Sequence, residues 1–359
     1  MCERNQPKKI TNNRTILCFF TYQNTHGNKK RKMKNLIASI NQQITEAIEI
    51  GQNADFKSPT KPIHNILLCG LGGSGIGGAI VSQLLKKELK VPFVCVNDYD
   101  TPAFVSENTL IIASSYSGNT EETIAAVKEG MTRGAEICVI TSGGTLAEMA
   151  KSNGWNHAIV PGGEQPRAML AYSLVQQIYL LKKYGLTSDK HVKDLNSVVE
   201  LLGQHESAIQ QEAEALAKKL HGSTPVIYAD SAFGGVATRV KQQINENAKE
   251  LCWDHVLPEM THNELVGWAG GSEKIAPIYL ATDYDHQRTS YRWAISKEVI
   301  SKYTSNINEI HAKGDSQIAQ VFYLIHLTDW LSWFMSDLKK VDATEVDVII
   351  HLKSEMGKK

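Results

Sequence analysis

The sequence predicts an α/β protein that contains two doubly wound units, each a parallel sheet with helices on both faces. Short runs rich in Val, Ile and Leu alternate along the chain with amphipathic helical patterns, which is typical of such sheets. A strand–turn–helix pattern near residue 65 returns, with fewer glycines, near residue 225, and this indicates a duplication. The chain has 359 residues, enough for two domains that each bury a core.

The composition argues against several classes of protein. The formal net charge is zero, which gives no support to a nucleic-acid partner or a membrane surface. No apolar run approaches the roughly 20 residues of a membrane-spanning helix. The six cysteines form no C-x-x-C pair, so we expect free thiols in a reducing cytoplasm rather than disulfides or a metal site. The cysteines expected to be buried in strands are Cys69, Cys95 and Cys138.

The first 32 residues differ from the rest of the chain. They are rich in Asn, Thr and Lys, end in a basic run and show no sustained periodicity. We expect residues 1–32 to be a disordered leader, with the native start at Met33; a mobile N-terminal tail is the alternative. The two sheet units are then expected at residues 33–187 and 188–359.

The first unit is expected to begin with a helix at 33–50, followed by five strands with helices between them. These strands are expected at 65–69, 92–97, 109–113, 136–141 and 157–160. A long helix at 168–184 closes the unit, and Arg167 at its start can lean over the edge of the sheet.

The second unit is expected to begin with one or two helices over 189–220, with Gly203 as a break. Thr344 is expected to cap a final helix that runs to Lys353. The other expected elements are strands at 225–229, 275–282 and 307–311 and helices at 236–249, 287–303 and 315–338.

Two polar turns in the first unit each stand between a strand and a helix. One follows the strand at 65–69 and contains six glycines, and the other follows the strand at 109–113. Such a helix start leaves backbone N–H groups unpaired at its positive end, where an anion binds. Because ligands of these sheets bind beyond the carboxyl ends of the strands, the two turns point to a phosphorylated ligand. Their hydroxyl side chains include Ser74, Ser115, Ser117 and Thr120.

The first turn also satisfies G-x-G-x-x-G over residues 70–75, the fingerprint of dinucleotide-binding units. That interpretation needs an acidic residue at the end of the second strand, and Asp98 and Asp100 lie near there. It leaves the hydroxyl cluster of the second turn without a role, whereas Ser74 suits a single phosphate. The two turns together therefore favour a sugar phosphate over a dinucleotide.

Four residues are candidates for catalysis. Glu246 lies between two asparagines near the end of a helix of the second unit, where a partly desolvated carboxylate can act as a general base. His262 lies in a polar loop after Pro258, and histidine is well suited to move a proton at neutral pH. Arg167 and Lys353 are the other two. Any one of them alone is more often a solvated or structural residue, and no motif predicts a metal site.

Five segments together resemble the bifunctional phosphoglucose/phosphomannose isomerase family, which has two sugar-isomerase (SIS) domains. The SYSGNT segment is typical of SIS domains in general, and the last two segments narrow the resemblance to this family. They are GLGGSG at 70–75, SSYSGNTEET at 114–123, Pro166-Arg167, NENAK at 245–249 and HNE at 262–264. The resemblance covers the chain from about Met33 onward and implies two flavodoxin-like three-layer α/β/α domains.

The resemblance implies an aldose–ketose isomerase that needs neither a metal nor a cofactor. Its substrates would be glucose 6-phosphate and mannose 6-phosphate, converted to fructose 6-phosphate through a cis-enediol. The residues that match the phosphate-binding positions of the family are Gly73, Ser74, Ser115, Ser117 and Thr120.

The resemblance also implies roles for the catalytic candidates. Glu246 would move the proton between C2 and C1, while Gly73 and Arg167 would stabilise the intermediate. His262, donated by the partner in a homodimer, would assist ring opening together with Lys353. In a separate segment, Thr344 is linked with acceptance of the mannose epimer.

Two other interpretations stay open besides a nucleotide-dependent oxidoreductase. One is a different SIS sugar-phosphate isomerase that uses another base. The other is a sugar-phosphate sensor without catalysis, but such regulators usually carry a helix-turn-helix segment and a basic face, and the neutral charge of this chain argues against one. The isomerase interpretation places the protein in cytoplasmic carbohydrate metabolism.

Overall fold

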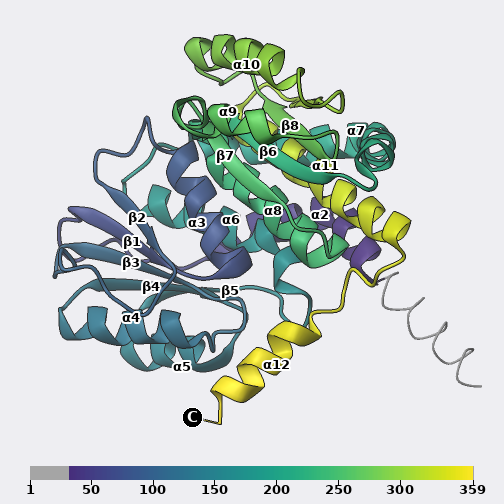
Figure 1. Cartoon of the computed structure of the whole chain (residues 1–359). Helices are drawn as coiled ribbons and strands as arrows, with labels where there is room; N and C mark the ends of the chain where they lie inside the picture. Colours follow the sequence, from purple (N-terminus) through teal and green to yellow (C-terminus); the bar gives the residue numbers. More distant parts are fainter. Residues whose placement is uncertain (1–31, 359) are drawn as a thin grey trace, which may run out of the picture.

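The computed structural model describes residues 32–358 of the chain (Figure 1). The leader expected at 1–32 therefore lies outside the described residues, apart from Lys32, which belongs to a helical stretch over 32–38. The helix α2 (Ile40–Asn53) follows this stretch after a turn at Ser39.

The first unit is built on a five-stranded sheet in which all neighbours are parallel. Its strands are β1 (Asn65–Cys69), β2 (Phe93–Val96), β3 (Thr109–Ser114), β4 (Glu136–Thr141) and β5 (Asn156–Ile159). Its remaining helices are α3 (Gly72–Leu84), α4 (Glu121–Thr132), α5 (Gly144–Asn153), the short η1 (Pro166–Ala168) and α6 (Leu170–Lys183). The strand order β2-β1-β3-β4-β5 is that of flavodoxin-like folds, whose ligand crevice lies between β1 and β3.

The second unit is built on a four-stranded parallel sheet, ordered β7-β6-β8-β9. Its strands are β6 (Thr224–Asp230), β7 (Trp253–Leu257), β8 (Ile275–Ala281) and β9 (Asn308–His311). Its long helices are α7 (Lys190–Leu220), α8 (Gly234–Ala248), α10 (Gln287–Ile300), α11 (Gln317–Lys339) and α12 (Asp347–Met356). Its short helices are η2 (Ser231–Phe233), η3 (Glu259–His262), α9 (Glu264–Gly267) and η4 (Trp268–Gly270). The repeated order of the first four strands confirms two doubly wound units of one kind.

Each sheet lies between two helical layers because alternate strand residues point to opposite faces. In the first sheet, Leu68 packs toward α3, where it contacts Gly78, and Ile111 packs toward α4 on the other face. In the second sheet, Ile227 packs with the α8 and α11 layer, and Tyr228 packs with α10. Both units are therefore three-layer α/β/α sandwiches.

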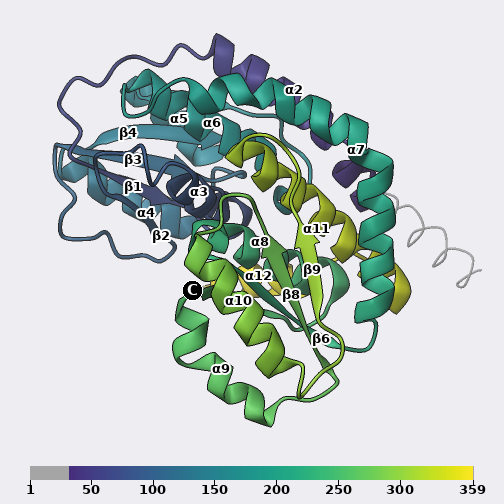
Figure 2. The same cartoon turned by 90° about the horizontal axis from the view of Figure 1, so that it is seen from above.

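The two units share one apolar core because their inner helical layers pack together. Helix α3 packs against α8, and α2 lies beside α7 (Figure 2). The buried cluster that includes Ile66 of the first sheet also includes Ile227 of the second. The aromatic residues Trp330 and Trp333 of α11 belong to this cluster as well. Continuous packing therefore fixes the position of one unit against the other.

The structure differs from the expectations at several places. Helix α7 runs unbroken through Gly203, because its packing along α11 outweighs the roughly 1 kcal/mol that a glycine costs within a helix. Strand β7 was not expected, since its polar Asp254 and His255 interrupt the apolar pattern of an edge strand. Cys95 lies on the edge strand β2 and is exposed rather than buried.

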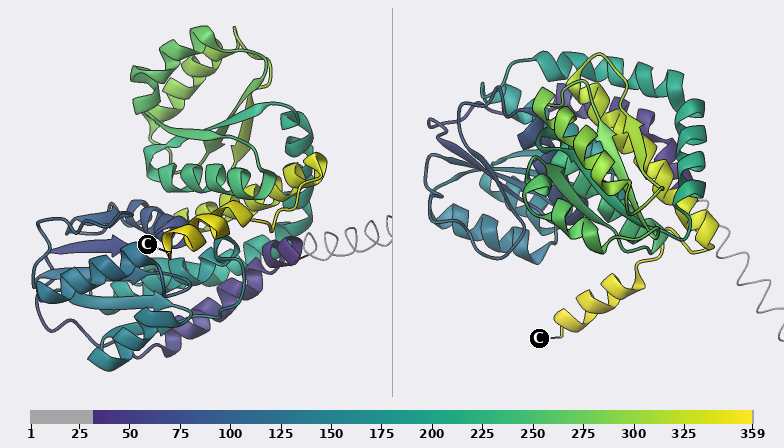
Figure 3. Two further views of the ribbon diagram at one scale, coloured as in Figure 1. Left: turned by 60° about the horizontal axis from the view of Figure 1, so that its bottom comes forward. Right: turned by 45° about the horizontal axis from the view of Figure 1, so that its top comes forward.

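The last helix begins later than expected. It starts at Asp347, with Val346 in the N-cap position, so Thr344 is not its cap. Thr344 is instead buried in the segment that precedes the helix. Helix α12 has no buried residue and stands away from the body of the molecule (Figure 3).

Two glycine substitutions test the helical packing. Gly51→Ala should lower the free energy of unfolding by about 1–3 kcal/mol, because its Cβ would lie 2.3 Å from the Tyr179 ring across the α2–α6 contact. Gly203→Ala should raise it by up to about 1 kcal/mol, because α7 is continuous there and only the end of the Asn41 side chain lies nearby, at 3.2 Å. Urea unfolding of both variants measures the difference. A destabilised Gly203→Ala variant would mean that α7 is interrupted at this residue.

Candidate active site

The N-termini of α3 and α4 meet beyond the carboxyl ends of β1 and β3. Neither helix has a side-chain hydrogen bond at its N-cap, so the first backbone N–H groups of both keep their capacity to bind an anion. Ser74, in the first turn of α3, ties the two together because its Oγ accepts the N–H of Tyr116 at 3.1 Å. The two polar turns predicted from the sequence therefore form one site.

The loop from β3 to α4 directs its hydroxyl groups around this site. The Oγ of Ser115 lies 2.8 Å from the Oγ1 of Thr120 and accepts the N–H of Gly118 at 3.2 Å. Gly118 has a φ of 68°, and a Cβ there would lie 1.8 Å from the carbonyl oxygen of Gly143. Only glycine therefore permits this loop shape. Ser117 is exposed, and its Oγ accepts the N–H of Asn119 at 3.3 Å.

Arg167 reaches the same place from η1. A Cβ on Gly73, at the start of α3, would lie 3.2 Å from the carbonyl oxygen of Pro166 and 3.4 Å from the Cα of Arg167. The absence of a side chain at Gly73 thus allows the backbone of η1 to lie directly against the N-terminus of α3. Arg167 is 5% exposed, so its charge is almost entirely removed from water.

A carboxylate of the second unit faces the Arg167 guanidinium. Nη1 of Arg167 lies 3.4 Å from Oε2 of Glu246, whose side chain is 31% exposed. Burial lowers the pKa of the Arg167 guanidinium, and the neighbouring Glu246 carboxylate opposes that effect. A buried cation beside a partly exposed carboxylate is an arrangement that can move a proton and stabilise the negative charge that results.

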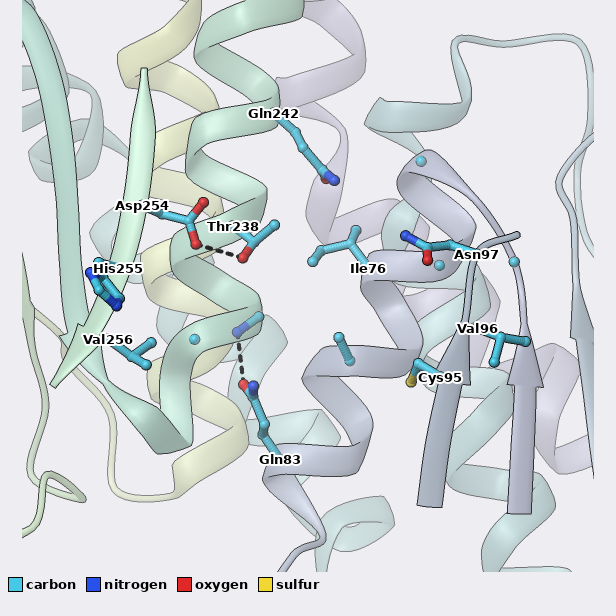
Figure 4. A pocket seen from close by; sticks show the side chains of 16 residues that line it. Ile76, Gln83, Cys95, Val96, Asn97, Thr238, Gln242, Asp254, His255 and Val256 are labelled. Carbon is cyan, nitrogen blue, oxygen red and sulfur yellow. Dashed lines mark hydrogen bonds between the residues drawn. The ribbon is translucent and has the colours of Figure 1, made fainter. Parts of the chain in front are cut away.

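Helix α8 carries Glu246 to the first unit because it runs against α3 in the opposite direction. At one end, the N–H of Gly235 donates to the Gln83 side chain at the end of α3. At the other end, Glu246 lies next to Arg167 and so close to the start of α3. Between them is a cleft of about 460 Å³, in which Gln242 and Asn97 point inward from opposite walls (Figure 4). Glu246 lies one helical turn beyond Gln242, on the face of α8 that lines this cleft.

Lys249 is a charged group at the site that the sequence did not predict. It ends α8 with a φ of 51°, and its Nζ donates to the carbonyl oxygens of Glu246 (2.6 Å) and Glu345 (2.7 Å). Burial lowers the pKa of the Lys249 ammonium, opposed by the Glu345 carboxylate. The position of this lysine in the NENAK segment was the available signal. Lys249 fastens the segment before α12 to the end of α8, and Arg167 donates to the Ala343 carbonyl in that segment.

The remaining predicted residues are only partly brought together. Thr344 follows Ala343, whose carbonyl oxygen accepts a hydrogen bond from Arg167. Buried Thr344 therefore lies near Arg167. His262 is exposed on η3, and Lys353 is exposed on the projecting helix α12. Neither His262 nor Lys353 is placed against Glu246 of the same chain by a described hydrogen bond or ion pair.

The described part of the chain shows neither a metal-binding cluster nor a membrane-spanning helix. Within residues 32–358, no group of three or more His, Cys, Asp or Glu side chains lies in an arrangement that could hold a metal ion. None of the helices in that same part of the chain is long and apolar enough to cross a bilayer.

Two family models match the two units separately. Residues 61–182 match the SIS domain, and residues 209–356 match the bacterial phospho-glucose isomerase C-terminal SIS domain. The fold is also similar to that of the C-terminal domain of glucosamine-fructose-6-phosphate aminotransferase from Francisella tularensis. That comparison has a TM-score of 0.70 and 13% identity and covers 88% of this chain and 98% of the other.

Curated relatives span almost the whole chain. A bifunctional phosphoglucose/phosphomannose isomerase of Caldicellulosiruptor bescii is 35% identical, over 89% of this chain and 98% of its own length. One from Aquifex aeolicus is also 35% identical, over 85% of this chain and 94% of its own length. With two SIS domains and this extent of identity, the chain belongs to the bifunctional phosphoglucose/phosphomannose isomerase family.

Proposed function

We propose that this protein is a metal-independent aldose–ketose isomerase that interconverts glucose 6-phosphate and mannose 6-phosphate with fructose 6-phosphate. The observation that carries the proposal is the Arg167–Glu246 pair beside two uncapped helix N-termini. The helix termini suit a phosphate, and the pair suits proton transfer at carbon atoms some distance from it. No cofactor is part of this proposal.

In the proposed reaction, one carboxylate serves both carbon atoms. Glu246 takes the proton from C2 of the open-chain aldose, the electron pair of the broken C–H bond forms the C1–C2 double bond, and the π electron pair of the C1 carbonyl moves to O1 to give a cis-enediolate. Arg167, with Gly73, stabilises the charge on its oxygens. The hydrogen of the C2 hydroxyl passes to O1 through the cis-enediol, and Glu246 returns its proton to C1 as the C2 carbonyl of the ketose forms. Phosphate binding by Ser74 and the hydroxyl groups of the β3–α4 loop provides the positioning energy.

Within one chain, His262 and Glu246 lie at opposite ends of α8. Strands β6 and β7 are parallel neighbours, so η3 after β7 lies at the same sheet edge as the start of α8. Glu246 is twelve residues into α8 from Gly234, about 18 Å along the axis. A histidine side chain cannot span that distance. This supports a homodimer in which His262 assists ring opening in the site of its partner.

Helix α12 supports the same dimer. Isolated helices of about ten residues are only marginally stable in water. The apolar side chains of α12 are nevertheless exposed, because no other part of the described chain buries them. We assign this surface to the second copy of the chain, with Lys353 on it. Its most exposed apolar residues are Val348, Ile350, Leu352 and Met356.

The free cysteines at 69, 95, 138 and 252 support the cytoplasmic location expected from the sequence.

The first experiment is a coupled assay in the presence of EDTA. Glucose 6-phosphate and mannose 6-phosphate are offered separately, and formation of fructose 6-phosphate is followed. We expect turnover of both sugars. Turnover of glucose 6-phosphate alone would remove the mannose activity, and activity restored only by added divalent metal would contradict metal independence. No turnover, with thermal stabilisation by these sugars intact, would favour a sensor or another sugar phosphate.

Glu246→Gln should abolish isomerisation while sugar-phosphate binding persists. The amide keeps the shape of the side chain but cannot accept the proton, so kcat should fall by about 10³-fold or more. Glu250→Gln is the matched control, because Glu250 lies just beyond the end of α8 and pairs with Lys339 instead. Thermal shifts with fructose 6-phosphate measure binding. Substantial residual turnover by Glu246→Gln would mean that another group is the base.

Mixing two inactive variants tests the dimer. His262→Ala and Glu246→Gln chains, exchanged by mild denaturation and refolding, should recover roughly a quarter of wild-type activity, because about half of the dimers are hybrids with one complete site each. Each variant taken through the same procedure alone is the control. If His262 acts on Glu246 of its own chain, the mixture stays inactive.

A further inference from the structure

Helix α8 presents a row of polar side chains to α11, where an apolar seam is usual between packed helices. Arg239, Gln243 and Asn247 are spaced four residues apart and so share one face of α8. Across from them, α11 places Asp329 and Ser332. All five side chains are buried, with at most 5% of any one exposed. Burying polar groups costs free energy unless each one has a hydrogen-bond partner. The partners of these five side chains therefore indicate the structural role of the row.

Asn247 links Arg167 to α11 through a chain of hydrogen bonds, in which every donor lies on the Arg167 side of its acceptor. Nε of Arg167 donates to Oδ1 of Asn247 at 2.8 Å, and Nδ2 of Asn247 donates to Oγ of Ser332 at 2.9 Å. The Ser332 hydroxyl donates its single hydrogen to the carbonyl oxygen of Asp329 at 2.7 Å. Because a guanidinium cannot accept a hydrogen bond and the serine hydrogen is already used, the amide of Asn247 has only one satisfied orientation.

The same row holds the main chain of Arg167. Nη2 of Arg239 donates to the carbonyl oxygen of Arg167 at 3.0 Å and pairs with the carboxylate of Asp329 at 2.7 Å. Nε2 of Gln243 donates to the other oxygen of that carboxylate at 2.8 Å. The α8–α11 interface therefore fixes both the backbone and the side chain of Arg167.

We propose that Asn247 is a positioning residue, which holds the Arg167 guanidinium so that its Nη1 edge faces Glu246 and the reacting carbon atoms. This inference rests on the proposed isomerase function. The guanidinium also donates to Oε1 of Gln165 at 3.1 Å and to the carbonyl of Ala343. These acceptors come from three separate segments and surround the guanidinium, except on the side that faces Glu246. A neutral acceptor at Nε keeps the full positive charge available to the enediolate.

Two variants of Asn247 test the proposal by steady-state kinetics. Asn247→Ala removes the acceptor, and kcat should fall by about 10- to 100-fold while KM for glucose 6-phosphate changes little, because the phosphate is held elsewhere. Asn247→Asp keeps an acceptor of the same size at Nε but adds a negative charge beside the guanidinium. We expect a similar fall in kcat, whereas a purely structural role would lower the folded fraction and leave the kcat of the folded enzyme unchanged.

A double mutant separates positioning from folding. If Asn247 acts only through Arg167, then Asn247→Ala should cause no further loss of kcat in an Arg167→Ala background. An equal loss in both backgrounds would overturn the proposal, as would wild-type kcat in Asn247→Ala. The matched control is Asn196→Ala: Asn196 is exposed on α7, and its loss should leave kcat unchanged.

A spectroscopic measurement distinguishes failure of this inference from failure of the proposed function. In ¹⁵N-arginine-labelled protein, the Nε–H signal that disappears in Arg167→Lys belongs to Arg167. That signal should be protected from solvent exchange in wild type and lose its protection in Asn247→Ala. If wild type shows no isomerase activity, the function is wrong whatever the spectrum shows. If wild type is active and the signal is unaffected by Asn247→Ala, the positioning role is wrong.

Discussion

The candidate active site depends on one guanidinium that is removed from water beside a carboxylate. Desolvating a cation is expensive unless nearby acceptors compensate, and Arg167 finds acceptors on α8, on its own η1 segment and on the segment before α12. Glu246 supplies the opposite charge at 3.4 Å. These groups come from both units, so the site exists only while the packing of α3 against α8 holds. If the proposed catalytic roles hold, the shared core is a requirement for activity as well as a source of stability.

The two units divide the work at this site. The first supplies uncapped helix N-termini and hydroxyl groups, which suit the binding of an anion. The second supplies the carboxylate, and its α8–α11 row orients the arginine that lies between the units. A polar row within a helix interface stabilises less than an apolar one would. Its retention next to Arg167 is understandable if fixed orientation of that side chain matters more than the lost stability.

The sequence predicted the parallel sheets and the two polar turns because both follow from local patterns: strand–helix alternation and hydroxyls or glycines at strand ends. It could not predict that Asn247 would contact Arg167, since their contact spans 80 positions and depends on how the units pack. The helix break predicted at Gly203 was wrong for a related reason: the packing of α7 on α11 outweighs the low helix propensity of glycine. Edge strand β7 was not predicted because its half-exposed polar residues obscure the alternating pattern of a strand.

The second sheet shows how the duplicated crevice changed. Asp230 ends β6, where the first unit has a glycine turn after β1. Its carboxylate accepts the N–H of Ala232 at 2.8 Å and that of His286, at the start of α10, at 3.1 Å. An internal anion therefore occupies the backbone donors that a phosphate would need. With its backbone donors satisfied in this way, the second unit lacks a glycine-rich turn, and its α8 instead brings Glu246, the proposed base, to the proposed phosphate site of the first unit.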